Sequence, residues 1–305
     1  MKFERVFSLV CAMLLASTPL IGAQAEEPAP PQITFRTEDP SGALGTWWWN
    51  CALIKNPEIL ASRLDFLQQN QVTEIYFCIG NQVTDEEVGA FIKECGRRGM
   101  RVACLGGDAI WIMEENESYD AWYARFREYQ QQAAEDEKFY GVHLDVEPHQ
   151  LSAYSKNADL CWQLYAQYVK KATDMARADG AIIELDIPFW LDDFKVTMDD
   201  KEWDLITYLT RTVDTITLMS YRDTARAMIS VSNKELMLGH RNNCRVVLGA
   251  ETYSLEGDAV SYMEEGKAYM YEELAKVYQD LSARKLSGGF GLAIHYVENW
   301  YKLKD

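Results

Sequence analysis

The chain has 305 residues and a formal net charge of −17 at pH 7, and hydrophobic residues make up 48% of it. This composition is typical of a globular protein, and the length is sufficient for one large domain. Nucleic acids and anionic membranes bind positively charged surfaces, so the acidic balance argues against both as partners and leaves uncharged substrates unaffected.

The N-terminus has the three parts of an export signal. Lys2 and Arg5 give a basic start, residues 6–15 form an apolar run, and residues 23–25 (AQA) are a small-x-small cleavage site. The apolar run is too short for a typical membrane anchor. We therefore predict a signal peptide over residues 1–25 and a secreted or periplasmic mature protein.

Eight strand-like segments alternate with helix-like segments along the rest of the chain. The strand-like segments are residues 42–50, 72–80, 100–107, 141–148, 181–188, 214–221, 245–253 and 288–296. Helices are predicted near residues 56–70, 84–99, 118–137, 155–178, 200–211, 224–242 and 259–284. Nearly continuous apolar strands that alternate with helices favour parallel pairing with right-handed crossovers.

The number of strands predicts an α/β fold, a (β/α)8 TIM barrel, as a single domain over residues 36–305. Residues 26–35 precede it as an extended linker that includes the run EEPAPP. An open doubly wound sheet is the alternative, but the glycine-rich phosphate loop expected after its first strand is missing from the sequence. Outside the signal, Cys78 and Cys104 lie in apolar runs, so we expect buried free thiols rather than disulfides.

Aromatic and polar residues gather where the predicted strands end, and in a TIM barrel the chemistry lies at these ends. They are Trp49, Asn81, Asp145, Glu147, Asp186, Trp190, Met219, Tyr221, Arg222, Glu251, His295 and, just beyond the last strand, Trp300. Aromatic faces pack on sugar rings, and carboxylates bind hydroxyls or move protons. A glycan is therefore the expected substrate, with no cofactor.

The stretch GVHLDVEPH places His143, Asp145 and Glu147 on alternate positions, so that the three side chains share one face of an extended strand. Two carboxylates that face each other at a barrel mouth repel, which raises one pKa and suits a general acid. His143 lies deeper along the strand, where a hydrogen-bonded core role is expected.

Three interpretations of the strand ends remain open. Trp300 is either a plug at the end of the barrel or a platform for a sugar. Glu251 either pairs with Arg222 or has a functional role. A metal site is conceivable from Asp145, Glu147, His149 and His295, although no His-x-His pair supports it.

Three stretches resemble the glycoside hydrolase family 18 barrels, the chitinases and endo-N-acetylglucosaminidases. They are HLDVE at the end of the fourth strand, LMSYRD at the end of the sixth, and a tryptophan beyond the eighth. The family has Asp-x-x-Asp-x-Asp-x-Glu in its fourth strand. The corresponding positions here are Tyr140, His143, Asp145 and Glu147, so the last two acids match and the first two differ.

The resemblance implies that Glu147 is the general acid and that Asp145 orients the 2-acetamido group of the substrate, whose carbonyl oxygen attacks the anomeric carbon. It also implies that Tyr221 donates to that oxygen, that Met219 is the family's methionine, and that Trp300 forms the floor of the sugar site. Because the family has an aspartate where this chain has His143, we expect a histidine cation that pairs with Asp145.

Three hypotheses follow. The first is a secreted glycoside hydrolase that acts on N-acetylhexosamine-containing glycans, with Glu147 as general acid and Asp145 assisting. A variant of it pairs Glu147 with Glu251 or Asp186 as acid and nucleophile. The second is a glycan-binding barrel without catalysis, and the third is a metal-dependent hydrolase.

We expect the exported chain to begin at Glu26. Expression of the full chain in a secreting bacterial host and N-terminal sequencing of the protein recovered outside the cytoplasm should give EEPAP. Ala25→Asp, which places a charge in the small-residue cleavage site, should leave the precursor uncleaved. An exported protein that still begins at Met1 would contradict the prediction.

Overall fold

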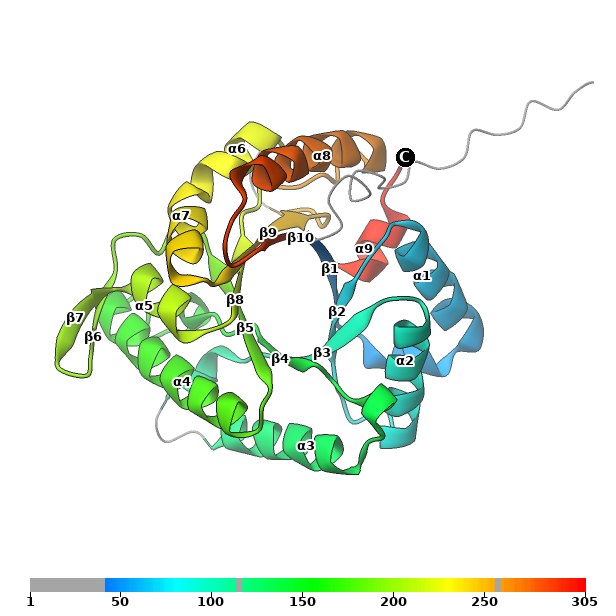
Figure 1. Ribbon diagram of the computed structural model, residues 1–305, viewed down its shortest axis with the longest axis horizontal. Helices are drawn as coiled ribbons and strands as arrows, with labels where there is room; N and C mark the ends of the chain where they lie inside the picture. The colour runs from blue at the N-terminus through cyan, green and yellow to red at the C-terminus, as the bar shows by residue number, and fades with distance from the viewer. Residues whose placement is uncertain (1–41, 114–116, 256–258) are drawn as a thin grey trace, which may run out of the picture. The chain divides into compact units, whose positions relative to one another are not determined.

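A computed structural model of the chain describes residues 42–113, 117–255 and 259–305. The expected signal peptide, the linker and the expected start of the domain at residue 36 lie outside the described residues. Within the described part, eight parallel strands close into a barrel in the order β1-β10-β9-β8-β5-β4-β3-β2. Figure 1 looks down this barrel and shows the helices in a ring around it. The predicted (β/α)8 TIM barrel is confirmed.

The elements follow the predicted alternation closely. The barrel strands are β1 (Ala43–Trp48), β2 (Glu74–Cys78), β3 (Arg101–Gly106), β4 (Gly141–Leu144), β5 (Ile182–Pro188), β8 (Thr215–Met219), β9 (Arg245–Glu251) and β10 (Phe290–His295). The helices are α1 (Pro57–Gln69), α2 (Asp85–Arg97), α3 (Ser118–Gln132), α4 (Ala158–Ala178), α5 (Leu205–Thr212), α6 (Ala225–Val231), α7 (Asn233–Asn242), α8 (Lys267–Arg284) and α9 (Val297–Lys302).

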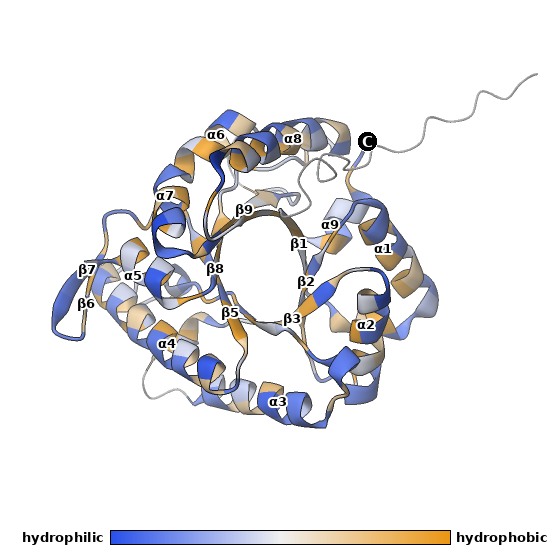
Figure 2. Ribbon diagram, in the orientation of Figure 1, coloured by the Kyte–Doolittle hydropathy of each residue, from blue (hydrophilic) through white to orange (hydrophobic). Residues whose placement is uncertain are grey.

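Helix α2 illustrates how the sequence sets the helix layer. Thr84 accepts a hydrogen bond from the backbone of Glu87, and the Glu87 carboxylate accepts one from the backbone of Thr84, which forms a capping box. The buried residues then recur at helical spacing, at Val88, Phe91 and Cys95. The same division into apolar and polar faces is visible around the ring of helices in Figure 2.

The structure differs from the predicted elements between β5 and β9. A hairpin of β6 (Lys195–Met198) and β7 (Lys201–Asp204) occupies the region before α5, and the two residues between its strands have positive φ. Such a two-residue turn matches the twist of a hairpin. The single helix predicted over residues 224–242 is split into α6 and α7 at Ser232, whose hydroxyl donates to the carbonyl of Met228.

Three consecutive tryptophans, Trp47, Trp48 and Trp49, lie at the end of β1 and just after it. Their side chains point alternately to the two faces of the strand. Trp48 is fully buried and packs edge-on against Phe91 in the helix layer. Trp47 and Trp49 point the other way, and both pack with the barrel interior. Trp48 therefore belongs to the core between the barrel and its helices.

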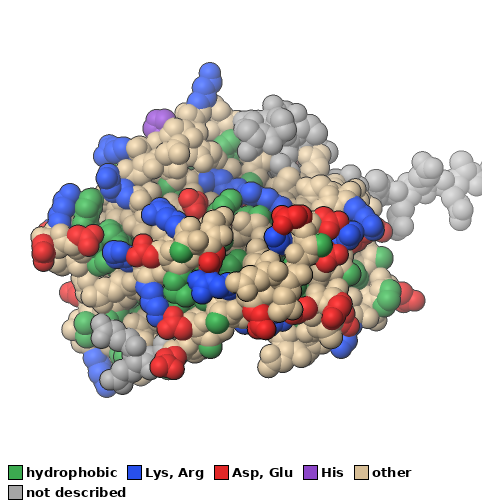
Figure 3. All heavy atoms as spheres, turned by 60° about the horizontal axis from the view of Figure 1, so that its bottom comes forward, with side chains coloured by type: hydrophobic (Ala, Val, Ile, Leu, Met, Phe, Trp, Pro, Cys, Tyr) green, Lys and Arg blue, Asp and Glu red, His purple; other side chains and the backbone are tan. Residues whose placement is uncertain are grey.

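The surface carries charges of both signs. On the face shown in Figure 3, lysine and arginine side chains lie among aspartates and glutamates. Ion pairs such as Lys93–Asp136 are well exposed, and exposed pairs contribute little to stability. The cysteines of the described residues are free thiols, as expected. Among the described residues, no helix is both long and apolar enough to cross a bilayer.

Gly107, just after β3, fixes the distance between the ends of β3 and β4. A Cβ at this position would lie 1.8 Å from the carbonyl oxygen of Asp145. That backbone atom cannot move without displacing the start of the loop that carries Asp145 and Glu147. Only glycine allows the two chain segments to approach this closely.

Gly107→Ala should therefore lower the free energy of unfolding by about 2 kcal/mol or more, because the added methyl group overlaps backbone. Gly96→Ala is the matched control, because a Cβ at this position in α2 meets nothing within 4 Å. The control should be neutral or stabilising by about 0.5–1 kcal/mol. Urea denaturation of both variants measures the difference, and equal stabilities would contradict the close approach.

Candidate active site

A pocket of about 580 Å³ opens at the carboxyl ends of β3 and β4. One side is formed by Gly107, Asp108 and Ile110, and the other includes Asp145 and Glu147. Of the residues predicted from the sequence, these two carboxylates therefore line a cavity, at the end of the barrel where TIM-barrel chemistry lies.

Asp145 and Glu147 follow directly on β4. The backbone N–H of Asp145 donates to the carbonyl of Gly106 at 2.9 Å, which holds this segment against the end of β3. Oδ1 of Asp145 is buried without a hydrogen-bond partner among the described residues. Burial and the nearby carboxylates of Asp186 and Glu147 raise the pKa of Asp145 well above its ordinary value.

Glu147 is the more accessible of the two acids. One of its oxygens lies 3.6 Å from Nε2 of His149, and the other accepts a hydrogen bond from the side chain of Gln150. Burial, followed by the carboxylate of Asp186, raises the pKa of Glu147. A carboxyl group with a raised pKa that still reaches a pocket is suited to proton donation near neutral pH.

Asp186, on β5, lies deeper and is only 2% exposed. Oδ1 accepts from Nε2 of His143 at 2.8 Å, and Oδ2 accepts from the indole N–H of Trp47 at 2.8 Å. Both oxygens are therefore occupied by donors from β4 and β1. The Asp186 side chain is therefore held in one orientation by residues of β4 and β1.

His143 lies fully buried between two carboxylates. Nδ1 is 3.0 Å from Glu184, and the ring stacks on Tyr76 at a centroid distance of 3.7 Å. Burial alone would lower the pKa of His143, but Asp186 and Glu184 outweigh it and raise the pKa to about 10. The expected pairing of His143 with Asp145 is corrected: both ring nitrogens are engaged by carboxylates from β5.

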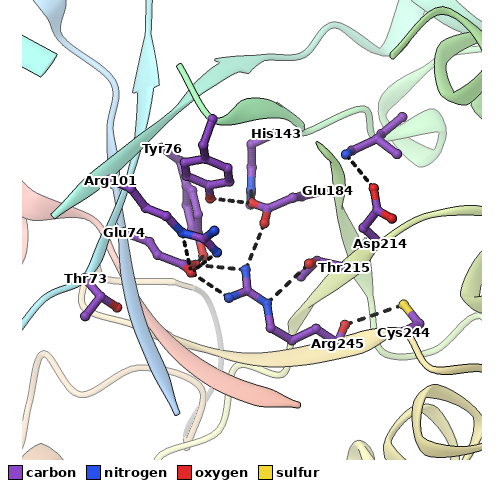
Figure 4. Close-up of polar contacts among 12 residues, drawn as sticks. Thr73, Glu74, Tyr76, Arg101, His143, Glu184, Asp214, Thr215, Cys244 and Arg245 are labelled. Carbon is purple, nitrogen blue, oxygen red and sulfur yellow. Dashed lines mark hydrogen bonds and ion pairs between the residues drawn. The ribbon is translucent and has the colours of Figure 1, made fainter. Parts of the chain in front are cut away.

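Arg245 connects this histidine to the opposite side of the barrel. Its guanidinium donates to both oxygens of Glu74, at 2.5 and 2.9 Å, and to Glu184 at 2.8 Å (Figure 4). Arg101 also binds Glu74, at 2.5 Å. Burial would raise the pKa of Glu184, but His143 and Arg245 lower it to about 2.

Sequence analysis did not identify this ion-pair network. The signal was present, because Glu74, Glu184 and Arg245 are charged residues that interrupt otherwise apolar strands. A charge in a strand that is covered on both faces requires a partner. The sequence does not indicate which partner, since the three residues come from β2, β5 and β9.

Where β9 and β10 end, three side chains form a hydrogen-bonded row, which is called the wall below. The indole N–H of Trp49 donates to Nε2 of His295 at 3.0 Å, so Nδ1 carries the proton and donates to Glu251 at 2.9 Å. The other oxygen of Glu251 accepts two backbone N–H groups, from Thr252 and Tyr253. This row fixes the orientation of the His295 ring.

Tyr221 stands next to this wall, with its ring stacked on that of His295 at a centroid distance of 6.2 Å. Burial raises its pKa, and the carboxylates of Glu251, Asp186 and Asp145 raise it further. Tyr221 therefore keeps its hydroxyl proton and can donate a hydrogen bond. Tyr221, which was predicted from the sequence, therefore lies near the carboxyl groups of Asp145 and Asp186.

The remaining predicted residues lie at the rim or away from it. Trp190 is 40% exposed and packs edge-on against His149, the neighbour of Glu147. Arg222 stacks over Phe189 at 4.6 Å. Met219 is half-buried where β8 ends.

Asn81 is exposed in the turn after β2. Among the described residues, no hydrogen bond or ring contact joins it to the other predicted residues.

Trp300 is not at the barrel mouth. Its side chain in α9 is fully buried, packs edge-on against Phe66 at 4.9 Å, and donates to the hydroxyl of Tyr271 at 2.9 Å. The expectation that Trp300 floors a sugar site is therefore wrong. The alternative of a buried plug describes its surroundings.

Two interpretations of Glu251 are also corrected. It does not pair with Arg222, because its oxygens bind His295 and the backbone. Neither Glu251 nor Asp186 lines the pocket of Asp145 and Glu147, so the variant with either as nucleophile is not favoured. Within the part of the chain that is described, no group of three or more His, Cys, Asp or Glu side chains is arranged to hold a metal.

No protein-family model matches the chain, and no curated protein matches it in sequence. Among solved structures, it is similar to a class V chitinase mutant from Cycas revoluta in complex with (GlcNAc)3, at 13% identity and a TM-score of 0.51. A GH18 chitinase from the same plant, also with (GlcNAc)3, matches at 12% identity and a TM-score of 0.50. Each match covers 85% of this chain and 96% of the other. These similarities show a glycoside hydrolase-like fold.

From the ion-pair network, we predict that the free energy of unfolding falls at alkaline pH. Because the pKa of His143 in the folded protein, about 10, exceeds its ordinary value of 6.5, the protonated ring stabilises the fold fully below about pH 6.5. This contribution is lost as the pH rises through about 10, with a slope of at most about 1.4 kcal/mol for each pH unit. Urea denaturation between pH 6 and 10 measures it.

His143→Gln is the control for this slope, because glutamine keeps a hydrogen-bond donor but has no proton to lose. The variant should be less stable at pH 6, and its stability should fall less steeply up to pH 10. Identical slopes in both proteins would contradict a charged His143.

Proposed function

We propose that the protein is a secreted glycoside hydrolase that acts on N-acetylhexosamine-containing glycans. The observation that carries the proposal is the pair Asp145 and Glu147, two carboxyl groups with raised pKa values that line one pocket at the carboxyl ends of the strands. The chitinase-like fold supports this assignment.

In the proposed reaction, Glu147 gives its proton to the glycosidic oxygen while the bond from that oxygen to the anomeric carbon breaks. The carbonyl oxygen of the substrate's 2-acetamido group bonds to the anomeric carbon in the same step. Water then attacks the anomeric carbon, the carboxylate of Glu147 takes up its proton, and the acetamido group is released. Glu147 is restored to the acid form.

Asp145 and Tyr221 hold the acetamido group in this scheme. The Tyr221 hydroxyl donates a hydrogen bond to its carbonyl oxygen, and Asp145 orients its N–H. The free Oδ1 of Asp145 supports this role, because a buried oxygen without a partner can accept a substrate donor at little cost in desolvation. Trp190 and Trp49 provide aromatic faces at the rim and the wall.

Glu147→Gln should abolish hydrolysis, with a loss on the order of 10²–10⁴-fold, because general acid catalysis contributes about that much. Residues 26–305 and the variant are compared on a panel of N-acetylglucosamine oligomers and N-glycans by product release, with and without chelator. Glu202→Gln, in the exposed ion pair Lys195–Glu202 of the hairpin, is the matched control and should remain fully active.

Glycan binding without cleavage, equal in the unmodified protein and in Glu147→Gln, would replace the hydrolase with a glycan-binding barrel. Activity that chelator removes would favour a metal-dependent hydrolase.

A further inference from the structure

Asp145, directly after β4, lies beside Asp186 on the neighbouring parallel strand β5. In the register of β4 and β5, Leu144 pairs with Leu185, so the next residue on each strand is an aspartate. Neighbouring strands are about 4.8 Å apart, which places the two carboxyl groups within strong electrostatic range. The two acids differ sharply in their hydrogen bonds.

Asp186 has a donor on each oxygen, and Oδ1 of Asp145 has none. The donors to Asp186 are the ring of His143 and the indole of Trp47, and an indole N–H can only donate. Hydrogen bonds of this kind stabilise the ionised form. These donors favour a carboxylate at Asp186, and Asp145, whose Oδ1 has no donor, is the acid of the two that is better suited to hold a proton.

The positive charge that balances Asp186 comes from His143, deeper in the barrel. Both nitrogens of His143 face carboxylates, which requires both to carry protons, and the ring stacks on Tyr76. The interior network contains three cations and three carboxylates, namely His143, Arg101 and Arg245 with Glu74, Glu184 and Asp186. It is neutral as it stands, so Asp145 has no cation of its own.

We propose that Asp186 is a positioning residue that keeps Asp145 protonated in the free protein. Asp145 then presents to the pocket a neutral carboxyl group, with one O–H donor and one carbonyl acceptor, in place of a carboxylate. Its importance for hydrolysis rests on the proposed function, but the protonation state is a property of the barrel itself.

The resemblance places an aspartate two residues before Asp145 on the same strand, where this chain has His143. Here the aspartate beside Asp145 comes from the neighbouring strand β5 instead. His143 instead serves Asp186, because it supplies the positive charge that makes an isolated carboxylate tolerable at this depth.

The titratable groups that face Asp145 come from several elements and act in different directions. They are His143 on β4, Glu147 after β4, Asp186 on β5, Tyr165 on α4 and Tyr221 after β8. Asp108 lines the same pocket as Asp145. Asp186 and Glu147 raise the pKa of Asp145, and His143 lowers it. Removal of Asp186 and removal of the His143 charge should therefore shift this pKa in opposite directions.

The test is a carbon-13 NMR titration of the aspartate carboxyl groups in residues 26–305, with the Asp145 signal assigned by its loss in Asp145→Asn. Glu147→Gln is present throughout to remove the second charge. Asp145 should remain protonated at pH 7. With Asp186→Asn added, its pKa should fall by about one unit or more. With His143→Gln added instead, its pKa should rise.

If Asp145 is ionised at pH 7 in the Glu147→Gln protein without a further substitution, the proposal is overturned, whether or not the added variants fold. A shift in the same direction in both variants would indicate a general structural change and would also overturn it. Because the readout is a titration and not turnover, a protein that cleaves no glycan can still confirm the role of Asp186. If the unmodified protein hydrolyses glycans but Asp145 titrates as an ionised group at pH 7, the role of Asp186 is refuted and the proposed hydrolase function is not.

Discussion

Arg245 joins the two halves of the barrel by binding Glu74 on one side and Glu184 on the other. TIM-barrel interiors are generally filled by layers of bulky apolar side chains, but here one layer is ionic. Buried ion pairs gain little net stability, since desolvation offsets the attraction, but removal of one partner is costly. The network therefore restricts which residues the strands can carry and how they align.

The site depends on this layer because each charged side chain shares a partner with the next one toward the pocket. Glu184 binds both Arg245 and His143, and His143 binds Asp186. Each link fixes the orientation of the next side chain without the use of a loop. A carboxylate is thus held rigidly beneath the pocket, on strands rather than on mobile segments, which favours precise electrostatics at Asp145 and Glu147.

The other wall of the site is built by a different principle. Trp49, His295 and Glu251 form a hydrogen-bonded row in which each group has one arrangement of donors and acceptors. Tyr221 stacks against this row. One side of the mouth therefore presents acids with raised pKa values, and the other presents the Tyr221 hydroxyl and aromatic rings. A neutral, hydroxyl-rich ligand such as a glycan matches both sides.

The sequence by itself determined the barrel, because alternating apolar strands and helices are local patterns that permit few topologies. It also placed Asp145 and Glu147 at a strand end, since residue spacing within one segment is read directly. The partners of His143, the burial of Trp300 and the contact of Arg245 with Glu74, 171 residues away, were decided only by the tertiary structure. Strand register and helix packing bring such groups together, and no local pattern encodes them.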